Sequence, residues 1–228
     1  MKATQHQGRS LVYLTVEPDD YDASLQYPLF ILLHGFGANM QDLASLAPAI
    51  NREGYVYACP QAPMSFQFGP GMVGYGWTPR GAEATVEDVR RAEEALDTFF
   101  VEIMEKYKVA PGRAILSGFS QGGGMTYRCG LRQPNLFAGL AVLSGTLPDT
   151  ESLRKRLPGD RGQPIFVAHG TLDAVLPVDR GRAAHQFLEA EGYQPRYREY
   201  PMAHEISPDV LADLVDWASG VLPPLSRA

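Results

Sequence analysis

The chain has 228 residues, 45% hydrophobic and 20% charged, a composition that suits one soluble domain with a substantial core. Its formal net charge of −6 gives no basic surface for a nucleic acid, and no apolar run is long enough to span a membrane. The polar start of the chain, residues 1–7, lacks the apolar segment of a signal peptide and is expected to be flexible. We therefore expect a cytoplasmic protein with no nucleic-acid partner and no integral membrane association.

Short apolar runs alternate with amphipathic segments in the first half of the chain. They predict strands at 11–16, 28–33 and 55–59 and helices at 42–51 and 85–107. The last of these helices is the clearest, since its apolar residues recur at spacings of three, four and seven and Thr85 with Asp88 forms a capping box.

The second half continues the alternation. It predicts strands at 113–117, 140–143, 165–168 and 196–200 and helices at 123–132, 180–191 and 208–221. Gly192 is a C-cap signal for the second of these helices, and strand 196–200 is expected near a sheet edge. Strands alternating with helices predict an α/β fold over residues 1–228 as a single domain. The expected sheet is mostly parallel, with helices on both faces and a site at the carboxyl ends of its strands.

Residues 60–81 interrupt this rhythm with a segment rich in glycine and proline that also carries Phe66, Phe68, Tyr75 and Trp77. A connection this long within a compact domain is usually functional or disordered, and its aromatic residues argue against disorder. We interpret it as an active-site loop that supplies apolar pocket wall. The alternative is an ordered surface loop packed by its own aromatic side chains.

The segment Gly118-Phe119-Ser120-Gln121-Gly122 fits the Gly-x-Ser-x-Gly nucleophile elbow and lies between a predicted strand and a predicted helix. In such an elbow a sharp turn holds the serine in a strained conformation and lifts its hydroxyl out of the sheet. Ser120 is therefore the candidate nucleophile.

A serine nucleophile needs a base, and the base needs a carboxylate to fix its tautomer. His204 follows the last predicted strand, and Asp173 follows the strand before it, so the chain order favours His204 as base and Asp173 as acid. Asp149 and Asp179 are alternative acids, and Asp173 itself could be only a turn residue.

The remaining histidines fit the role of base less well. His169 directly follows a strand, but no suitable acid lies between that strand and His169. His185 lies within a predicted helix and is expected on the surface. His34 precedes the nucleophile in the chain, so it is expected to support the loop after strand 28–33, with a role as base the weaker alternative.

The negative charge that develops on the substrate needs two backbone N–H donors. One is expected from Gln121, the residue after the nucleophile and the start of a helix. The second is assigned to Phe36, in a glycine-containing loop after strand 28–33.

The two cysteines, Cys59 and Cys129, lack metal-ligand spacing and are interpreted as buried free thiols, with a disulfide left open.

Together these segments resemble the phospholipase/carboxylesterase group of α/β-hydrolases, which includes the acyl-protein thioesterases. The resemblance covers about residues 28–222 and depends on Leu33-His34-Gly35-Phe36-Gly37, Cys59-Pro60-Gln61-Ala62-Pro63, Gly76-Trp77, Gly118-Phe119-Ser120-Gln121-Gly122-Gly123, His169-Gly170 with Asp173, and Met202-Ala203-His204. It implies the α/β-hydrolase fold, a triad of Ser120, Asp173 and His204, and an oxyanion hole formed by the amides of Phe36 and Gln121.

The chain departs from the eukaryotic thioesterases of this group at two places. Those enzymes usually have leucine where Phe36 stands, and Gly-Met-Gly or a similar string where this chain has Pro201-Met202-Ala203. Because these positions shape the acyl pocket, the thioesterase substrate is not carried over. The chain looks more like the bacterial carboxylesterases of the group.

The expected function is hydrolysis of carboxylic esters with small to medium apolar acyl groups, through an acyl-enzyme and without a metal or organic cofactor. The pocket-lining candidates are Phe36, Trp77, Val175, Leu176 and Met202, chosen for their proximity in sequence to the triad. Acyl thioesterase or lysophospholipase activity is the alternative within enzymes, and a catalytically silent binding protein is the alternative outside them. A homodimer is expected because the aromatic residues of 60–81 would need cover.

Overall fold

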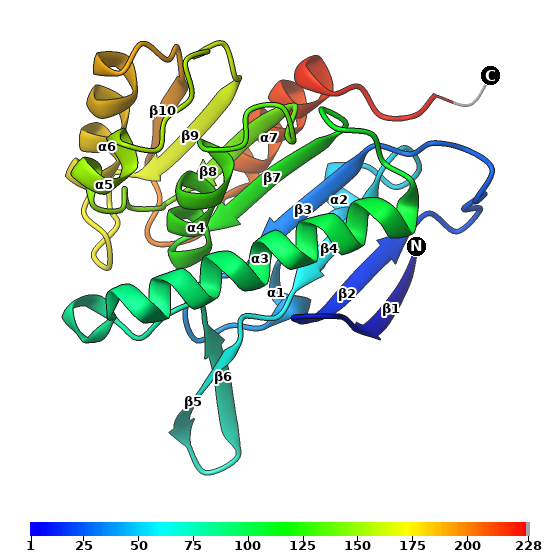
Figure 1. Cartoon of the computed structure of the whole chain (residues 1–228), viewed down its shortest axis with the longest axis horizontal. Coiled ribbons are helices and arrows are strands. Elements are labelled where there is room, and N and C mark those ends of the chain that lie inside the picture. Colours follow the sequence, from blue (N-terminus) through cyan, green and yellow to red (C-terminus); the bar gives the residue numbers. More distant parts are fainter. Residues whose placement is uncertain (227–228) are drawn as a thin grey trace.

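A central sheet of eight strands organises the chain. The computed structural model describes the backbone of residues 1–226, with all side chains except that of Ala82. The strands are β1 (Lys2–Gln7), β2 (Val12–Glu17), β3 (Leu29–Leu33), β4 (Val56–Pro60), β7 (Ala114–Phe119), β8 (Gly139–Leu143), β9 (Ile165–Gly170) and β10 (Arg196–Tyr200). Their order across the sheet is β1-β2-β4-β3-β7-β8-β9-β10 (Figure 1). From β4 to β10 all neighbouring strands are parallel, whereas β2 is antiparallel to both of its neighbours, β1 and β4.

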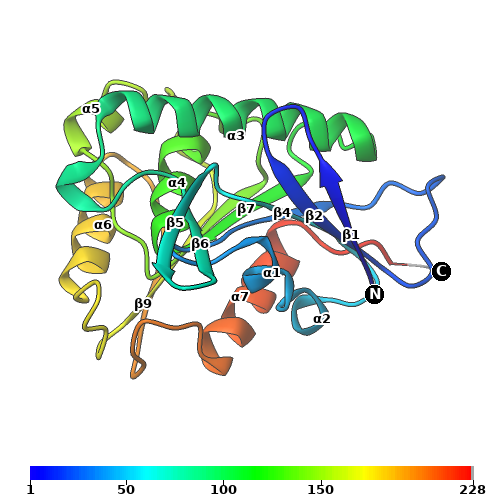
Figure 2. The same ribbon diagram turned by 90° about the horizontal axis from the view of Figure 1, so that it is seen from below.

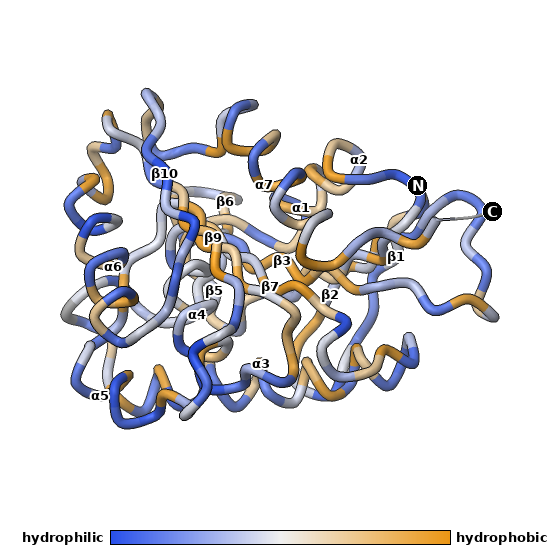
Figure 3. Tube along the Cα trace, turned by 90° about the horizontal axis from the view of Figure 1, so that it is seen from above, coloured by the Kyte–Doolittle hydropathy of each residue, from blue (hydrophilic) through white to orange (hydrophobic). Residues whose placement is uncertain are grey.

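Helices cover both faces of this sheet, as predicted (Figure 2). One face carries α3 (Val86–Tyr107), α4 (Gln121–Gly130), α5 (Thr150–Arg154) and α6 (Asp179–Ala190), and the other carries α1 (Met40–Ala44), α2 (Ala47–Ile50) and α7 (Pro208–Val221). Strands β3, β4, β8 and β9 are buried throughout, because both of their faces are covered. Figure 3 shows the hydrophobic residues concentrated along these central strands.

Several local predictions are confirmed at the level of individual hydrogen bonds. The Thr85 hydroxyl accepts the amide of Asp88 at 3.1 Å, while the Asp88 carboxylate accepts the amide of Thr85 at 2.9 Å, so the capping box of α3 is complete. Gly192 follows α6 with a φ of +90°, the left-handed conformation of a helix C-cap. Cys59 and Cys129 are buried and free.

The expectation of a flexible N-terminus is wrong. Residues 2–7 form β1, which pairs with β2 along its whole length, and the His6 ring is hydrogen-bonded to the Thr15 hydroxyl at 2.9 Å. β1 is an edge strand and most of its side chains are exposed, so its sequence lacks the apolar alternation from which a strand is predicted. Backbone hydrogen bonds to β2 hold it in place.

The predicted helix at 42–51 is two short helices, α1 and α2. Pro48 lies in the first turn of α2. Because proline cannot donate to a preceding turn, it suits the start of a helix and not its interior.

Residues 60–81 contain a β-hairpin that projects from the body of the molecule (Figure 1). Its strands are β5 (Met64–Gly69) and β6 (Met72–Gly76), and a short 3₁₀ turn, η1 (Gly81–Glu83), follows. The prediction of a loop therefore missed this hairpin. The side chains of Phe68, Met72 and Val73 are exposed on the hairpin, and the homodimer expected from this segment stays a prediction.

Among the described residues, no helix combines the length and apolar character needed to cross a bilayer.

Candidate active site

Ser120 lies at the turn between β7 and α4, at the centre of the sheet. Its φ of 54° and ψ of −116° lie outside the regions that ordinary residues favour, as a nucleophile elbow requires. A Cβ on Gly122 would lie 2.1 Å from the carbonyl oxygen of Leu33, so only glycine lets α4 approach β3 this closely. The Ser120 amide donates to the Leu143 carbonyl on β8 at 2.9 Å, which holds the turn against the neighbouring strand.

The structure brings the three predicted triad residues into one hydrogen-bonded chain. The His204 Nε2 atom lies 2.9 Å from the Ser120 Oγ atom, and the His204 Nδ1 atom lies 2.6 Å from the Asp173 Oδ2 atom. Asp173 follows β9 and His204 follows β10, so parallel strands deliver both residues to the carboxyl edge where Ser120 lies. The ring of Phe119 lies 4.8 Å from the His204 ring and covers one side of the imidazole.

Asp173 is held as a carboxylate by its own loop. Burial alone would raise its pKa, but hydrogen bonds from His204 and from the amides of Leu176 and Val175 outweigh burial and hold the pKa below its ordinary value. The two amides donate to Oδ1 at 2.8 and 2.9 Å, which leaves Oδ2 for His204. An ionised Asp173 that accepts from Nδ1 fixes the His204 tautomer with Nε2 free to accept a proton.

The other candidate acids and bases have partners elsewhere. Asp149 caps the N-terminus of α5 by accepting two of its amides, and Asp179 forms an ion pair with Arg182. His185 stacks on the ring of Tyr197 on the outer edge of the sheet.

The backbone N–H groups of Phe36 and Gln121 fit the predicted oxyanion hole. Among the described residues, neither group donates to a protein acceptor. A Cβ on Gly35 would lie 3.3 Å from the Ser120 Cβ atom, so the loop that carries Phe36 lies directly against the nucleophile. Gly37 has a φ of +84° and donates to the carbonyl of Tyr75 at 2.8 Å, which ties this loop to the hairpin.

His34 has the supporting position expected of it. Its Nε2 atom accepts the amide of Ala62 at 3.1 Å, so the imidazole is neutral and its Nδ1–H donates to the carbonyl of Gly35 at 2.8 Å. It therefore connects the loop after β3, which carries Phe36, to the segment after β4. It does not reach Ser120.

Burial lowers the pKa of His34 to about 4, which makes stability depend on pH. The unfolded chain protonates His34 as the pH falls through its ordinary value near 6.5, whereas the folded chain does so only near 4. Stability is therefore lost between these values, by about 3 kcal/mol in all. We expect the free energy of unfolding of wild type to fall relative to that of His34→Gln from neutral pH to about pH 4, as measured by urea denaturation. A constant difference between the two proteins would contradict this.

The Gln121 side chain has a structural role that the sequence did not reveal. Its Oε1 atom accepts the amide of Trp77 at 2.8 Å, and its Nε2 group donates to the carbonyl of Thr78 at 2.9 Å. The end of the hairpin segment is thereby attached to the first residue of α4. The string Gly-x-Ser-Gln-Gly contains this residue, but its partners lie more than forty positions away.

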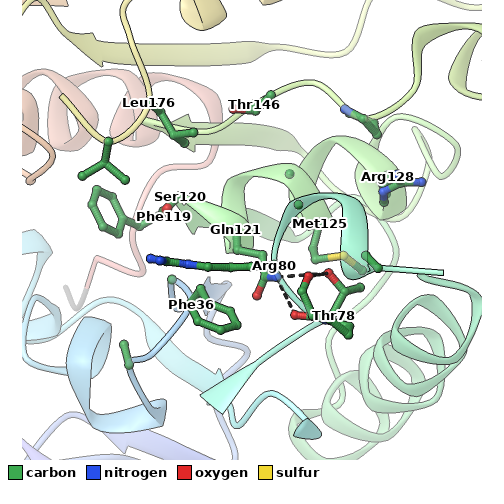
Figure 4. Close-up of a pocket in the computed structure, with 18 of the residues that line it drawn as sticks. Phe36, Thr78, Arg80, Phe119, Ser120, Gln121, Met125, Arg128, Thr146 and Leu176 are labelled. Carbon is green, nitrogen blue, oxygen red and sulfur yellow. Dashed lines mark hydrogen bonds between the residues drawn. The ribbon is translucent and has the colours of Figure 1, made fainter. Parts of the chain in front are cut away.

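The triad opens into a cavity of about 690 Å³. Phe36, Val175 and Leu176 line it, as predicted (Figure 4). The other lining residues come from the oxyanion loop, α1, the segment after β6, α3, α4, the segment after β8 and the triad: Gly35, Ala38, Asp42, Thr78, Pro79, Arg80, Gly81, Ala84, Val89, Phe119, Ser120, Gln121, Gly124, Met125, Arg128, Thr146, Leu147, Pro148 and His204.

Two of the predicted lining residues are absent from this cavity wall. Trp77 is fully buried and donates its indole N–H to the carbonyl of His34 at 2.9 Å. The Met202 side chain lies in the core beneath α7, and its carbonyl accepts the amide of Leu172, which joins the His204 loop to the Asp173 loop. The prediction from proximity in sequence to the triad is wrong for Trp77 and Met202, because both side chains point into the core.

The aromatic residues of 60–81 support the cavity from behind. Phe66 and Phe68 pack on the Phe36 ring at centroid distances of 4.7 and 5.9 Å. Residues 78–81 form the part of the segment that lines the cavity, and Thr78 and Arg80 give this wall a polar and cationic character. The prediction of an apolar wall from this segment is wrong in that respect.

His169 is a buried residue behind the acid. Its Nε2–H donates to the carbonyl of Leu176 at 2.8 Å, and the Leu176 amide is one of the two that hold Asp173. His169 thus fixes the turn that orients the carboxylate, and it does not touch Ser120 or His204.

We expect His169→Leu to lower kcat by about 10²-fold, because a small displacement of the acid misaligns the base. His169→Gln places an amide N–H near the position of Nε2 and should recover most of the loss. Steady-state kinetics would be combined with the NMR signal of the His204 Nδ1–H proton, which is hydrogen-bonded to Asp173. The intensity of this signal should decrease only in the leucine variant. Equal activity of the two variants would contradict this positioning role.

A mostly parallel sheet that carries a serine on a strained turn between its central strand and the next helix is the arrangement of the α/β-hydrolases. Residues 22–221 match the model of the Phospholipase/Carboxylesterase family, and the chain belongs to that family of hydrolases.

Individual relatives agree with this membership. The chain is 28% identical over 180 residues to acyl-protein thioesterase 1 of Gibberella zeae, covering 72% of this chain and 75% of the relative. It is 32% identical over 142 residues to carboxylesterase SOBER1 of Arabidopsis thaliana, covering 61% of this chain and 60% of the relative. Among solved structures, esterase PE8 superposes with a TM-score of 0.80 at 25% identity, covering 97% of this chain and 100% of that one.

Proposed function

We propose that this hydrolase is a serine carboxylesterase that acts through an acyl-enzyme, with Ser120 as nucleophile, His204 as general base and acid, and Asp173 as the acid that orients it. The observation that carries the proposal is the continuous series of hydrogen bonds from Asp173 through His204 to Ser120, the last two of which line the cavity.

In the acylation step, the Ser120 Oγ atom attacks the ester carbonyl carbon while His204 Nε2 takes the hydroxyl proton. The carbonyl oxygen becomes an oxyanion, which the amides of Phe36 and Gln121 stabilise. Collapse of the tetrahedral intermediate breaks the bond to the alkoxy oxygen, and the imidazolium donates its proton to that leaving group.

In the deacylation step, a water molecule replaces the alcohol. His204 removes a proton from this water as it attacks the acyl carbon, and the same two amides stabilise the second oxyanion. The imidazolium then returns the proton to Ser120, and the carboxylic acid leaves. The Asp173 carboxylate stays ionised and stabilises the positive charge of His204 in both steps.

The lining of the cavity supports an ester with an apolar acyl group as substrate. Phe36, Phe119, Met125 and Leu176 give it apolar surface, and its volume of about 690 Å³ suits an acyl group of small to medium size. Acyl thioesterase activity is the second candidate, because the relatives of this chain include acyl-protein thioesterase 1 and the same triad would serve.

An acyl-chain panel tests the proposal. Oxygen esters and matched thioesters of acetate, butanoate, hexanoate and palmitate would be compared by kcat/KM. We expect butanoate and hexanoate oxygen esters to be the best substrates. A preference for palmitoyl thioester would favour the thioesterase, and failure of a fluorophosphonate probe to label Ser120 would favour a silent binding protein.

A further inference from the structure

Arg80 is a cation in the cavity wall that has no carboxylate partner within the part of the chain that the structure describes. It lies after the hairpin, and among the described residues its recorded contact is the Phe36 ring, whose centroid lies 4.9 Å from the guanidinium carbon. Figure 4 shows the Arg80 side chain extended beside the Phe36 ring, and the residue is exposed to solvent. Its guanidinium donors are therefore available to a molecule that enters.

The contact with Phe36 sets where that molecule would bind. A cation over an aromatic ring is stabilised less than a guanidinium in a two-point contact with a carboxylate, so Arg80 can exchange the ring for an anion or hold both. Phe36 also supplies the backbone amide beside Ser120. An anion held by Arg80 over the Phe36 ring would therefore lie beside the loop that carries this amide.

A second arginine strengthens the positive character of the cavity. Arg128 lines the wall that α4 contributes, and 20% of its side chain is exposed. Its nearest carboxylate oxygen, on Glu93, is 3.7 Å away, and Glu93 already makes two hydrogen bonds to Arg156 at 2.9 and 2.7 Å. Burial lowers the pKa of Arg128, whereas the charge of Glu93 raises it.

One lining carboxylate opposes these cations. Asp42 is the acidic side chain in the described cavity wall, and burial raises its pKa. The wall therefore carries two arginines against one carboxylate, in a protein whose overall net charge is −6. Glu93 lies beside Arg128 and the Asp173 carboxylate lies behind His204, so Arg80 is the lining cation without a carboxylate among the described residues, and a cation exposed in a cleft attracts anionic ligands.

We propose that the cavity contains a carboxylate subsite at Arg80, and that the preferred esters carry an ionised carboxylate a few bonds from the scissile carbonyl, as hemiesters of dicarboxylic acids do. This inference rests on the proposed esterase function and names its substrate class.

Three p-nitrophenyl esters of equal acyl length test the proposal: the hexanoate, the adipate hemiester and the neutral adipamate, in which a carboxamide replaces the carboxylate. The measured quantity is the ratio of kcat/KM for the hemiester to that for the adipamate. We expect a ratio above one in wild type, a fall of about tenfold in Arg80→Gln, and a smaller fall in Arg80→Lys, which keeps the charge but loses the planar fork.

Two further variants serve as controls. Arg9→Gln removes one positive charge at the β1–β2 turn, outside the cavity wall, and should leave the ratio unchanged. Asp42→Asn removes the opposing carboxylate and should raise the ratio of kcat/KM for the hemiester to that for the adipamate. A wild-type ratio below one, or an equal ratio in wild type and Arg80→Gln, would overturn the subsite. Hydrolysis of the hexanoate reports on the proposed esterase by itself, so the two proposals can fail separately.

Discussion

Ser120→Ala is expected to lower kcat for ester hydrolysis by about 10⁶-fold, because the acyl-enzyme cannot form without the nucleophile. The amides of Phe36 and Gln121 stay in place in this variant, so a small residual rate above that of uncatalysed hydrolysis should persist. Since the members of a triad act as a unit, adding His204→Ala to Ser120→Ala should cost little more.

Ser117→Ala is the matched control for this prediction. Ser117 lies three residues earlier, on β7, and its buried hydroxyl has no hydrogen-bond partner among the described residues. Removing that hydroxyl should leave kcat/KM close to that of wild type, with circular dichroism confirming that both variants fold. Ester hydrolysis near the wild-type rate in Ser120→Ala would exclude Ser120 as the nucleophile.

Asp173→Asn is expected to lower kcat by about 10⁴-fold. An asparagine placed like Asp173 can still accept the amides of Val175 and Leu176 through its Oδ1 atom. Its amide nitrogen then faces His204 Nδ1 and can only donate. The imidazole must accept at Nδ1 and carry its proton on Nε2, and in that tautomer it cannot take the proton of Ser120.

The two alternative acids provide the controls. Asp149→Asn and Asp179→Asn affect the start of α5 and an exposed ion pair, so each should change thermal stability slightly and kcat by less than a factor of about two. The comparison is made by steady-state kinetics on one neutral ester. If Asp149→Asn or Asp179→Asn lost as much activity as Asp173→Asn, the assignment of the acid would be wrong.

Chain order and local pattern were sufficient to predict most of the fold. The alternation of buried strands with amphipathic helices gave the parallel sheet and its two covered faces, and the capping box of Thr85 and Asp88 gave the start of α3. The sequence missed the short helical elements α5 and η1 and, among the strands, β1 and the β5–β6 hairpin. Most side chains of β1 are exposed, so it lacks hydrophobic periodicity. β5 does alternate apolar and polar residues, in Met64-Ser65-Phe66-Gln67-Phe68, but the glycine and proline content of residues 60–81 favoured a loop.

The sequence by itself determined Ser120 as the candidate nucleophile and favoured Asp173 and His204 as its partners, with Asp149 and Asp179 still open as acids. A Gly-x-Ser-x-Gly turn after a buried strand, with an aspartate and a histidine after two later strands, has one arrangement in a parallel sheet, because all of those strands end at the same edge. The structure has that arrangement, with Ser120, His204 and Asp173 in hydrogen-bonding contact.

Only the tertiary structure decided which side chains surround the three candidate catalytic residues. Trp77 and Met202 lie near the triad in sequence but point into the core, whereas Arg80 and Arg128 come from separate elements and line one cavity. Side-chain direction depends on how a turn or helix packs against segments far away in the chain. A sequence pattern specifies such packing for buried strands and helix faces, but not for the loops that meet above the carboxyl edge of the sheet.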